Sequence, residues 1–592
     1  IKNNPGGEKW FRTTPSVIET ETKTWDAAKN AFVPDTHRIT KNLDVNAMGN
    51  VRESETETKV WDDTLKDAAG APAPDWVKSE KEHTINTGGF IRNVPRNTTS
   101  ISSVFDDTAG INRYVIDTLK MTKNGSVDAQ GNVRKQVVET FLVNDANARI
   151  FTALDNTLVT AVKAEIDADV FTTGTSAFFD RNERMTITNI GGFKKGQPAR
   201  TITETEIYDT EKKGYSKDSI RITDNLRISA QGNVVKQRTE TKIYDESLKD
   251  TSGKVVGGYV EAELTETESS GRFRKGIAEK VETTTSIWNP DYKDATGKAA
   301  PCYVRDSRRI TQSEVDVKGN IRSQDVESFV YNIDKYDGTV TDGDLDAKGN
   351  KITDAWIKSE HSMTLNADFT KNVPGSTVTI SEIWDETVKD ATGKVVGGYV
   401  ADSVKKSQNT GIDTKGNIKQ QVIETFVISD ANLNAGKSLK DLGVKDLAAL
   451  KTLGVTNLIA NKTGTGKDFE PSERQTIINN PRGGVFLRNT PSETDTLTEV
   501  WDPKKVGGAG FVNDTLRSTK NLKRNGLGNV LESETETKVW DDTLKDATGA
   551  PAPAWVNSEK EHTINTGGFV RNMPKNSMTI SATYDDAPGV NK

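Results

Sequence analysis

Few residues of this 592-residue chain have both the type and the spacing that binding or catalysis requires. Residues 464–467 (GTGK) match part of a phosphate-binding loop, in which glycines let backbone N–H groups approach the phosphates and a lysine neutralises them. The full motif needs a glycine where Asn461 stands and a serine or threonine where Asp468 stands. We therefore predict no phosphate site in this segment.

An acidic run has a spacing that could bind a metal ion. Asp342, Asp344 and Asp346 alternate as the first ligands of a calcium loop do, but no bidentate glutamate follows in register. The pattern favours a solvated acidic turn, and Ca²⁺ binding there stays open as the alternative. Cys302 is the single cysteine, which excludes a disulfide framework and a cysteine-rich metal site.

The four histidines offer little material for acid–base catalysis. His83 and His562 occupy the same position of a repeated EKEHTIN segment, His361 stands in a related context, and His37 stands alone. A residue that is copied by repetition is more often structural than catalytic, so we predict a structural role. We predict no catalytic, cofactor-binding or metal-binding residue, and we expect the chain not to be an enzyme.

The composition disfavours several other classes of protein. Hydrophobic residues make up 33% of the chain and charged residues 28%, with a net charge of −7. A pI near 5.6 disfavours non-specific nucleic-acid binding, which needs a basic surface. No stretch approaches the ~20 apolar residues of a membrane-spanning helix. So polar a chain needs a regular pattern to fold.

One long segment occurs twice. Residues 53–95 are nearly identical to residues 532–574, and the matching Trp61 and Trp540 are 479 residues apart. No secretory signal is visible, and the chain begins and ends within the repeated pattern. We therefore expect a processed product or a part of a longer protein.

A shorter repeat of about 36–44 residues runs through most of the chain. Its theme is an alternation of Thr and Glu, then an aliphatic residue, an aromatic residue, and Asp or Asn. We call the aromatic position the anchor. Thirteen anchors occur, two of them aliphatic: Trp25, Trp61, Phe105, Val143, Tyr208, Tyr244, Trp288, Tyr331, Trp384, Ile428, Trp501, Trp540 and Tyr584.

Each repeat predicts two strands and two turns, because strict alternation rich in Thr, Val and Trp is typical of strands and Asp, Gly and Pro separate the runs. A strand from Asn50 to Trp61 would be roughly 36 Å long at ~3.3 Å per residue. We thus predict an all-β fold, a repetitive antiparallel meander of about 26 long strands. Each face of such a sheet buries little, so repetition must stabilise it.

In five repeats an aromatic residue stands on each side of a 14-residue loop. We predict a cross-strand pair that clamps the hairpin, worth roughly 0.2–1 kcal/mol. A stacking platform for sugar rings is the alternative. The predicted pairs are Trp61 with Trp76, Tyr244 with Tyr259, Trp288 with Tyr303, Trp384 with Tyr399, and Trp540 with Trp555.

The turns at the other end of the strands contain Asp-x-x-Gly-Asn. The aspartate can accept backbone hydrogen bonds and the glycine can adopt a positive φ. The predicted turn residues are Asp128, Gly131, Asn132, Asp316, Gly319, Asn320, Asp413, Gly416 and Asn417. Bulges or strand breaks are expected where proline, which has no N–H to donate, enters the pattern: Pro15, Pro95, Pro374, Pro491 and Pro574.

Two helical insertions interrupt the pattern, each after an aliphatic anchor. Residues 145–168 predict one amphipathic helix, and residues 437–458 predict two short helices that end at Gly443 and Gly454. Each insertion is interpreted as a cap over the sheet or, alternatively, as a contact point for a partner. The apolar stripe of the first helix is Ile150, Leu154, Leu158, Val162 and Ile166. The resulting segments are 1–142, 143–200 (insertion), 201–427, 428–477 (insertion) and 478–592.

The sequences Tyr208-Asp209 and Tyr244-Asp245, together with turns such as residues 128–133, resemble the YD-repeat (RHS-type) proteins. Those are large secreted or surface proteins of bacteria, made of repeated β-hairpins wound into a sheet or shell. The resemblance implies a secreted or surface location and a structure of stacked hairpins.

The pattern as a whole favours a structural protein. We expect a subunit of an extracellular or cell-surface fibre, sheath or matrix, whose partners are copies of itself or flanking repeats of a longer chain. One alternative is a surface adhesin or carbohydrate-binding array that contacts glycans. Another is a YD-repeat-like encapsulating shell. No cofactor, nucleic-acid partner or membrane span is predicted.

Overall fold

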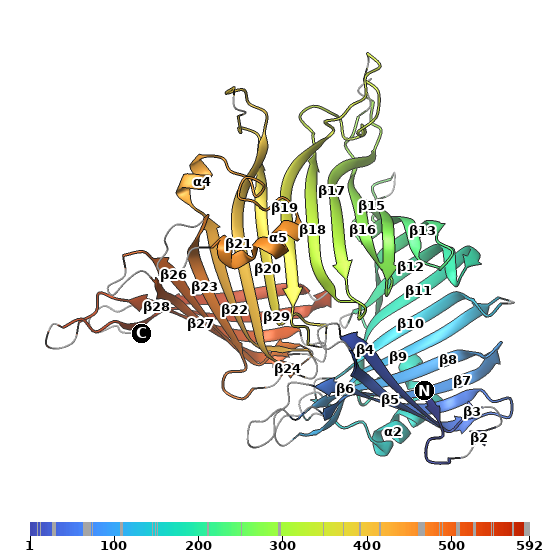
Figure 1. Cartoon of the computed structure of the whole chain (residues 1–592). Coiled ribbons are helices and arrows are strands. Elements are labelled where there is room, and N and C mark those ends of the chain that lie inside the picture. Colours follow the sequence, from blue (N-terminus) through green and yellow to red (C-terminus); the bar gives the residue numbers. More distant parts are fainter. Residues whose placement is uncertain are drawn as a thin grey trace.

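A computed structural model describes most of the chain as one long, curved β-sheet with short helices on it (Figure 1). The residues that it does not describe are 9, 12–13, 27–30, 63–72, 74, 107–110, 129, 145, 148–149, 151, 210–211, 250–251, 294–297, 347, 371, 390–391, 414–415, 460–467, 485, 488, 505–509, 525–528, 546–547, 549, 571–572 and 585–592.

The elements follow one another with few interruptions. The first half contains β1 (Lys2–Asn3), β2 (Trp10–Phe11), β3 (Thr14–Pro15), β4 (Val17–Asp26), β5 (Ala31–Val45), β6 (Val51–Asp62), β7 (Asp75–Ile91), β8 (Val94–Asp106), β9 (Arg113–Val127), β10 (Val133–Val143), α2 (Asn156–Asp167), α3 (Val170–Thr173), β11 (Phe179–Lys194), β12 (Gln197–Asp209), β13 (Gly214–Ile228), β14 (Val234–Asp245), β15 (Gly258–Arg274) and β16 (Ile277–Asn289). The second half contains β17 (Cys302–Val315), β18 (Ile321–Tyr331), β19 (Trp356–Ala367), β20 (Ser376–Asp385), β21 (Gly398–Ile412), β22 (Ile418–Ile428), α4 (Asp430–Asn434), α5 (Leu447–Leu453), the 3₁₀ turn η1 (Val455–Asn457), β23 (Phe469–Asn479), β24 (Phe486–Leu487), β25 (Thr490–Pro491), β26 (Glu493–Asp502), β27 (Gly510–Arg524), β28 (Val530–Asp541), β29 (Ala554–Val570) and β30 (Met573–Thr583).

The predicted antiparallel meander is confirmed. In the described residues, 26 strands form one sheet, and each long strand pairs antiparallel with the next one in the chain. The sheet is open: its edge strands are β4, beside which only the two-residue β1 pairs, and β30. Strand β6 has 12 residues, close to the length expected between Asn50 and Trp61, and the longest strands reach 17 residues. The pairs β2–β3 and β24–β25 form two small separate ribbons.

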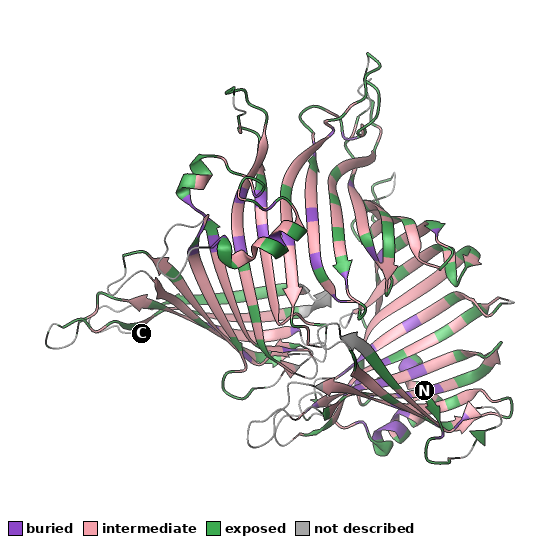
Figure 2. Cartoon of the chain, in the orientation of Figure 1, coloured by how far each residue is buried: buried purple, intermediate pink, exposed green. Residues whose placement is uncertain are grey.

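The two faces of the sheet differ in chemistry, as the alternation predicts. On one face, carboxylates and ammonium groups pair across strands, as with Glu55 and Lys81 at 2.7 Å. On the other, hydroxyls pair, as with Thr40 and Thr56 at 3.0 Å. Most strand residues on both faces are half-buried, because no described element covers the single layer over most of its area (Figure 2). We call the first the aromatic face, which in β6 bears Glu53, Glu55, Glu57, Lys59 and Trp61, and the second the threonine face, which in β6 bears Ser54, Thr56, Thr58 and Val60.

A column of β-bulges crosses the sheet near the aromatic anchors. In the β6–β7 pair, Thr58 lies opposite Glu80 and Lys59 opposite Lys78, so Ser79 is an extra residue. A bulge bends its strand and increases the local twist, so a bulge in each hairpin accounts for the curvature in Figure 1. Each extra residue lies three positions after the second aromatic position: Asp35, Ser79, Asp117, Asn182, Asp218, Ala262, Asp306, Ser359, Asp402, Ser472, Asp514 and Ser558.

The prolines fall at irregularities near the other end of the strands, as predicted. The register shifts just before Pro95 pairs with Phe90 and before Pro574 pairs with Phe569. Pro15 and Pro491 lie in the small ribbons, and Pro374 lies in the connection before β20.

The two helical insertions lie where the sequence places them, after β10 and β22, and both lie on the aromatic face. They attach to backbone groups beside bulges. The N–H of Ile116 donates to the carbonyl of Thr152, and the N–H of Ala401 donates to the carbonyl of Lys437, both at 2.9 Å. Because a bulge leaves ladder groups unpaired, it supplies the attachment points.

The predicted helix boundaries need correction. Helix α2 begins after Asp155, whose carboxylate accepts the N–H of Leu158 at 2.9 Å, so residues 145–155 precede it. Leu154 is buried, but it bonds to the backbone of Tyr114 instead of lying on a helix. Ile150 is exposed and is not part of the apolar stripe of the helix. Here the N-cap carboxylate sets the start of the helix, and the apolar periodicity of the sequence alone did not locate that start.

The second insertion also differs in detail. Residues 447–453 form α5, capped by Asp446 and ended by Gly454 with φ 71°, as predicted for that glycine. The stretch up to Gly443 makes only isolated turns, with bonds from Leu442 to Leu439 and from Gly443 to Lys440. The short α4 was not predicted.

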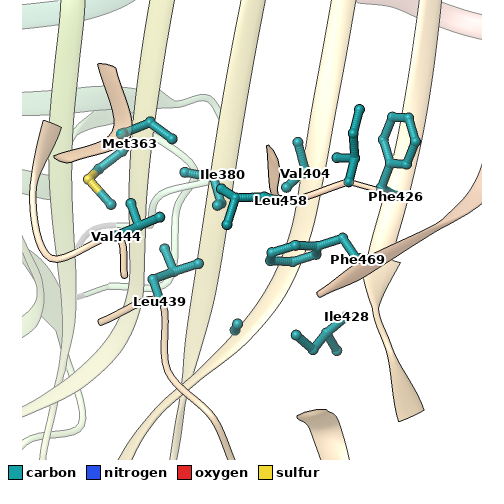
Figure 3. Close-up of a cluster of buried hydrophobic side chains, with 12 residues drawn as sticks. Met363, Ile380, Val404, Phe426, Ile428, Leu439, Val444, Leu458 and Phe469 are labelled. Atoms are coloured by element: carbon teal, nitrogen blue, oxygen red, sulfur yellow. The ribbon is translucent and has the colours of Figure 1, made fainter. Parts of the chain in front are cut away.

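Fully buried side chains gather under these insertions. Around the second, Met363, Ile380 and Val404 of the sheet meet Leu439 and other residues of the insertion (Figure 3). The first forms a similar cluster with β8 to β11. Both clusters include an aliphatic anchor and the Phe opposite it: Val143 with Phe179, and Ile428 with Phe469.

Candidate functional site

The five predicted aromatic pairs face each other across adjacent strands. Trp61 and Trp76 lie opposite each other, with ring centroids 5.3 Å apart and planes at 73°. Edge-to-face pairs of this kind contribute about 0.5–1.5 kcal/mol beyond burial. The other four pairs have centroids 5.1–5.2 Å apart and planes at 69–85°: Tyr244 with Tyr259, Trp288 with Tyr303, Trp384 with Tyr399, and Trp540 with Trp555.

Four more pairs of the same geometry were missed by the sequence reading, because their loops are not 14 residues long. The register of the strands, and not the loop length, brings the rings together. The signal in the sequence was an aromatic residue at the first or second position of each returning strand. These pairs are Phe105 with Tyr114, Tyr208 with Tyr215, Tyr331 with Trp356, and Trp501 with Phe511.

A glycine of the loop lies against the clamp in two repeats. Gly397 has a φ of 65°, and a Cβ atom at that position would come within 2.8 Å of the Trp384 ring. Gly257 stands in the same relation to Tyr244, with a φ of 60°. The ring therefore packs onto a bare backbone, which explains the Gly-Gly sequence before the second aromatic residue.

Cations lie between successive clamps. The Nζ atom of Lys217, two residues after Tyr215, lies 5.5 Å from the Tyr244 ring and 5.6 Å from the Tyr259 ring of the next hairpin. Lys78 and Lys358 lie over the following clamp in the same way. Each such contact contributes about 0.5–1 kcal/mol at an exposed site and links one hairpin to its neighbour.

Tyrosine hydroxyls bond to glutamates of other hairpins. The Tyr114 hydroxyl on β9 donates to Glu57 on β6 at 3.0 Å, and the Tyr303 hydroxyl on β17 donates to Glu240 on β14. Burial, together with the negative charge of Glu57, raises the pKa of Tyr114 far above its usual value. These phenols therefore stay protonated and act as hydrogen-bond donors.

The predicted turn residues form one recurring structure at the opposite end of the strands. The Asp128 carboxylate accepts the N–H groups of Gln130 and Asn132 at 2.9 Å, and Gly131 has a φ of 89°. The other two turns repeat this, with Asp316 and Asp413 bonded to Asn320 and Asn417, and with φ values of 93° and 84° at Gly319 and Gly416.

A ladder of asparagines at that end was missed altogether. The side-chain amide of Asn86 donates to the carbonyl of Val51 on the preceding strand at 3.0 Å, and its oxygen accepts the Thr98 hydroxyl of the next strand at 2.8 Å. One side chain thus joins three strands. In the described part of the chain, ten asparagines donate in this way: Asn42, Asn86, Asn124, Asn189, Asn225, Asn366, Asn409, Asn479, Asn521 and Asn565.

Each histidine lies beside a carboxylate of a neighbouring strand. His83 and His562 contact Glu53 and Glu532, and His37 contacts Glu19. His361 lies between Asp325 at 2.8 Å and Glu382 at 2.7 Å.

The surroundings of His361 stabilise its charged form. Burial by itself would lower the pKa of His361, but the hydrogen bonds to Asp325 and Glu382 outweigh it and raise that pKa to about 9. The second oxygen of Glu382 accepts the N–H of Leu439 at 2.9 Å, so the charged group also holds the second insertion.

The other candidate groups do not converge. Asp344 accepts the N–H of Thr341 and Asp346 that of Asn350, each within its own turn, whereas Asp342 accepts the N–H of Ala355 just before β19. Among the described residues, no three His, Cys, Asp or Glu side chains could hold a metal ion together. Residues 464–467 lie outside the described part of the chain.

The arrangement as a whole is suited to holding strands together. The aromatic edge carries clamps and cations, the turn edge carries Asx turns and asparagines, and charge pairs lie between them. Most of the described clamp residues are half-buried and Tyr331 is buried, and cations or neighbouring hairpins contact several of the rings.

Comparison with known proteins gives no family. No protein-family model matches the chain, and no curated protein matches it. The solved structures that align with most of its length include the following two. The crystal structure of TcdB2-TccC3-TEV has 8% identity and a TM-score of 0.09, covering 97% of this chain and 40% of that one. The outer membrane transporter YddB from Escherichia coli has 9% identity and a TM-score of 0.17, covering 91% and 74%.

This chain therefore spans less than half the length of the first of these structures. TM-scores this low carry no argument about fold or function. Among the described helices, none combines the length and the apolar character needed to cross a bilayer.

Proposed function

We propose that this chain is a structural subunit of an extracellular or cell-surface fibre, sheath or matrix, assembled from repetitive β-sheet. The observation that carries the proposal is the repetition of one set of contacts along the sheet. A clamp, a bulge and an Asx turn or asparagine recur from hairpin to hairpin. Because each hairpin mainly contacts its neighbours, the sheet can extend without a change of design.

The two copies of the long repeat support this proposal. Trp540 and Trp555 form the same clamp as Trp61 and Trp76, with centroids 5.2 Å apart against 5.3 Å. The strand register also agrees, since His83 lies opposite Ile101 and His562 opposite Ile580. A long stretch of sheet thus recurs with the same local structure, as is expected of a structural protein built from repeats.

The charge pattern is consistent with a single-layer sheet whose two faces both contact water. Opposite charges pair across strands on the aromatic face, as in Arg184 with Glu139 at 2.7 Å and Lys560 with Glu534 at 3.1 Å. Exposed pairs contribute roughly 0–1 kcal/mol each. Their main effect is on register, because a slip of one residue would move every charged side chain to the threonine face.

The two alternatives make different demands on the structure. Glycan binding needs free aromatic faces, whereas the described rings contact each other, cations or loop glycines. A YD-repeat-like shell needs closure, and the described sheet is open between β4 and β30. Both alternatives therefore rank below the structural proposal.

Electron microscopy of the purified chain over a concentration series tests the proposal. We expect regular filaments or ribbons whose fraction rises with concentration. Monodisperse particles at high concentration would contradict it. Tryptophan fluorescence in the presence of a glycan panel is the matched test of the alternative: quenching by a defined glycan would favour an adhesin, and an unchanged spectrum would favour the clamp.

A further inference from the structure

Strand β30 is a second copy of strand β8. Residues 94–106 (VPRNTTSISSVFD) and residues 573–585 (MPKNSMTISATYD) align without gaps, so that Asn97 corresponds to Asn576 and Ile101 to Ile580. Each pairs on one side with the same partner strand, β7 or β29, in the same register. The two strands therefore present the same backbone edge on their other side.

That other side is occupied in the first copy. Strand β8 pairs there with β9, with Ile101 opposite Leu119 and Thr99 opposite Met121. Ile101 is 0% exposed and Thr99 4%. On the threonine face, the Ser102 hydroxyl bonds to the Thr118 hydroxyl. Strand β9 thus satisfies the edge of β8 through its backbone, through two apolar side chains and through a hydroxyl pair.

In the described sheet, β30 has β29 as its one long partner, and its side chains on the aromatic face are open to solvent. Ile580 is 59% exposed and Met578 is 54% exposed. These side chains correspond to Ile101 and Thr99, and two adjacent exposed apolar residues on an edge strand mark a site for strand addition.

We propose that the free edge of β30 binds an extended polypeptide segment with the side-chain pattern of β9. The register of the first copy places Leu119 of such a segment opposite Ile580 and Met121 opposite Met578. Thr118 would then face Ser581, and Thr122 would face Ser577. This inference rests on the proposed function, because it specifies how the sheet of such an assembly is extended.

The chemistry of recognition is β-strand addition. Main-chain hydrogen bonds supply affinity for any extended segment, and the alternate side chains supply specificity. The occupant needs long apolar residues at the positions of Leu119 and Met121, and threonines on either side of them. A segment with carboxylates at those two positions would place charges against Ile580 and Met578, and it would be rejected.

The proposal is tested by measuring the binding of a peptide of residues 113–127 to the whole chain, which carries Cys302→Ser. We expect saturable one-to-one binding by fluorescence anisotropy. The control peptide carries Leu119→Glu and Met121→Glu, and it should bind about tenfold more weakly or worse, since two apolar contacts are lost. Equal binding of both peptides, or binding of neither, would overturn the proposal.

Disulfide formation tests the register. A Leu119→Cys peptide should cross-link to a chain with Ile580→Cys in a glutathione buffer, because directly opposed residues have Cα atoms about 4.5–5.5 Å apart, within disulfide range. A chain with Thr579→Cys presents its thiol on the other face and should cross-link poorly. Both cysteines lie on the same exposed strand, so circular dichroism of both variants controls for folding. Equal cross-linking would overturn the register.

The outcome is separable from that of the proposed function. Filaments that form although the peptide does not bind would refute the β30 edge site and leave the structural function standing. A peptide that binds in register to a chain that never assembles would support the edge site and contradict the structural function.

Discussion

The Nζ atom of Lys163 on α2 lies 2.6 Å from Oε1 of Glu53 on β6, although 110 residues separate them in the sequence. The same oxygen lies 2.8 Å from Nε2 of His83. Burial would raise the pKa of Glu53, but its bonds to Lys163 and His83 lower it. The first insertion is thereby attached to a strand four positions away from the strand that it follows.

Substituting Lys163→Met should loosen α2 without disturbing the sheet. The methionine keeps the aliphatic stem but loses the ion pair, which is partly buried, so we expect a loss on the order of 1 kcal/mol in local stability. Hydrogen exchange of residues 156–167, followed by mass spectrometry, measures it.

Lys523→Met is the matched control. Lys523 pairs with Glu532 at 2.9 Å, and Glu532 is the copy of Glu53 in the second long repeat. This pair joins adjacent strands, and Lys523 is well exposed. Its loss should cost less local stability than the loss of Lys163, because water screens an exposed pair. Equal effects of the two substitutions on their own elements would show that Lys163 does not hold α2.

The asparagine ladder predicts a pronounced effect of a nearly isosteric change. In Asn409→Asp, the carboxylate would face the carbonyl of Pro374, to which the amide now donates at 2.9 Å. A hydrogen bond is replaced by the repulsion of two acceptors, so we expect a loss of about 1–3 kcal/mol. Faster exchange of amides in β20 to β22 at neutral pH would show it.

A substitution of Gln421, which bonds to Asn409 from the other side, distinguishes the repulsion of two acceptors from the simple loss of a hydrogen bond. Gln421 donates to the oxygen of Asn409 at 2.9 Å, and an aspartate would still accept that bond. Gln421→Leu should therefore cost less than Asn409→Asp. In acid, protonation of the new carboxyl restores a donor and should recover part of the stability of Asn409→Asp; recovery that failed would argue against the ladder.

The sequence predicts the repeating parts of this fold well and its irregular parts poorly. The alternation of residue types predicted which residues of β6 share a face. The thirteen anchors predicted about 26 strands, and the described sheet has 26, one of which is the two-residue β1, because nearly every anchor marks the end of one long strand and the approach of the next. The column of bulges was not predicted. A bulge residue such as Ser79 or Asp402 has no distinctive residue type, and only the pairing of the strands shows that it is extra. The start of α2 was not predicted, because it is set by the N-cap carboxylate of Asp155, whereas the apolar periodicity begins several residues earlier.

The candidate site divides in the same way. Clamps with a fixed loop length, such as Trp61 with Trp76, were found from their spacing. Tyr331 with Trp356 was not found, because an insertion lengthens its loop and only strand pairing in three dimensions restores the contact. The asparagines were overlooked because Asn86 looks like an ordinary strand end until its two bonds to neighbouring strands are seen.

The triad around His361 predicts a pH dependence that is local to β18–β20. The folded pKa of about 9 lies above the ordinary value of 6.5, so the folded state binds the proton more tightly than the unfolded state does. The resulting stability is complete below about pH 6.5 and is lost as the pH rises through 9. Exchange of amides near residue 361 should thus reveal weaker protection at pH 9.5 than at pH 6, by about 1–3 kcal/mol.

His361→Gln supplies the control for that profile. Glutamine retains hydrogen-bonding capacity toward Asp325 or Glu382 but does not titrate, so the local pH dependence should disappear. Since Glu382 also bonds to Leu439, residues around 439 should follow the same profile in the parent chain. A profile that persists in the glutamine variant would assign it to another group.

The contact of the clamp with the loop predicts a difference between two glycines of the same loop. Gly397 and Gly393 both have positive φ, 65° and 83°, so alanine at either is strained by roughly 1 kcal/mol. A methyl group at 397 would also press on the Trp384 ring, whereas one at 393 would meet open space. Gly397→Ala should therefore lower the protection of β20 and β21 further than Gly393→Ala and shift the tryptophan emission. If the clamp does not rest on the loop, the two variants will behave alike; Gly257→Ala and Gly253→Ala repeat the comparison at Tyr244.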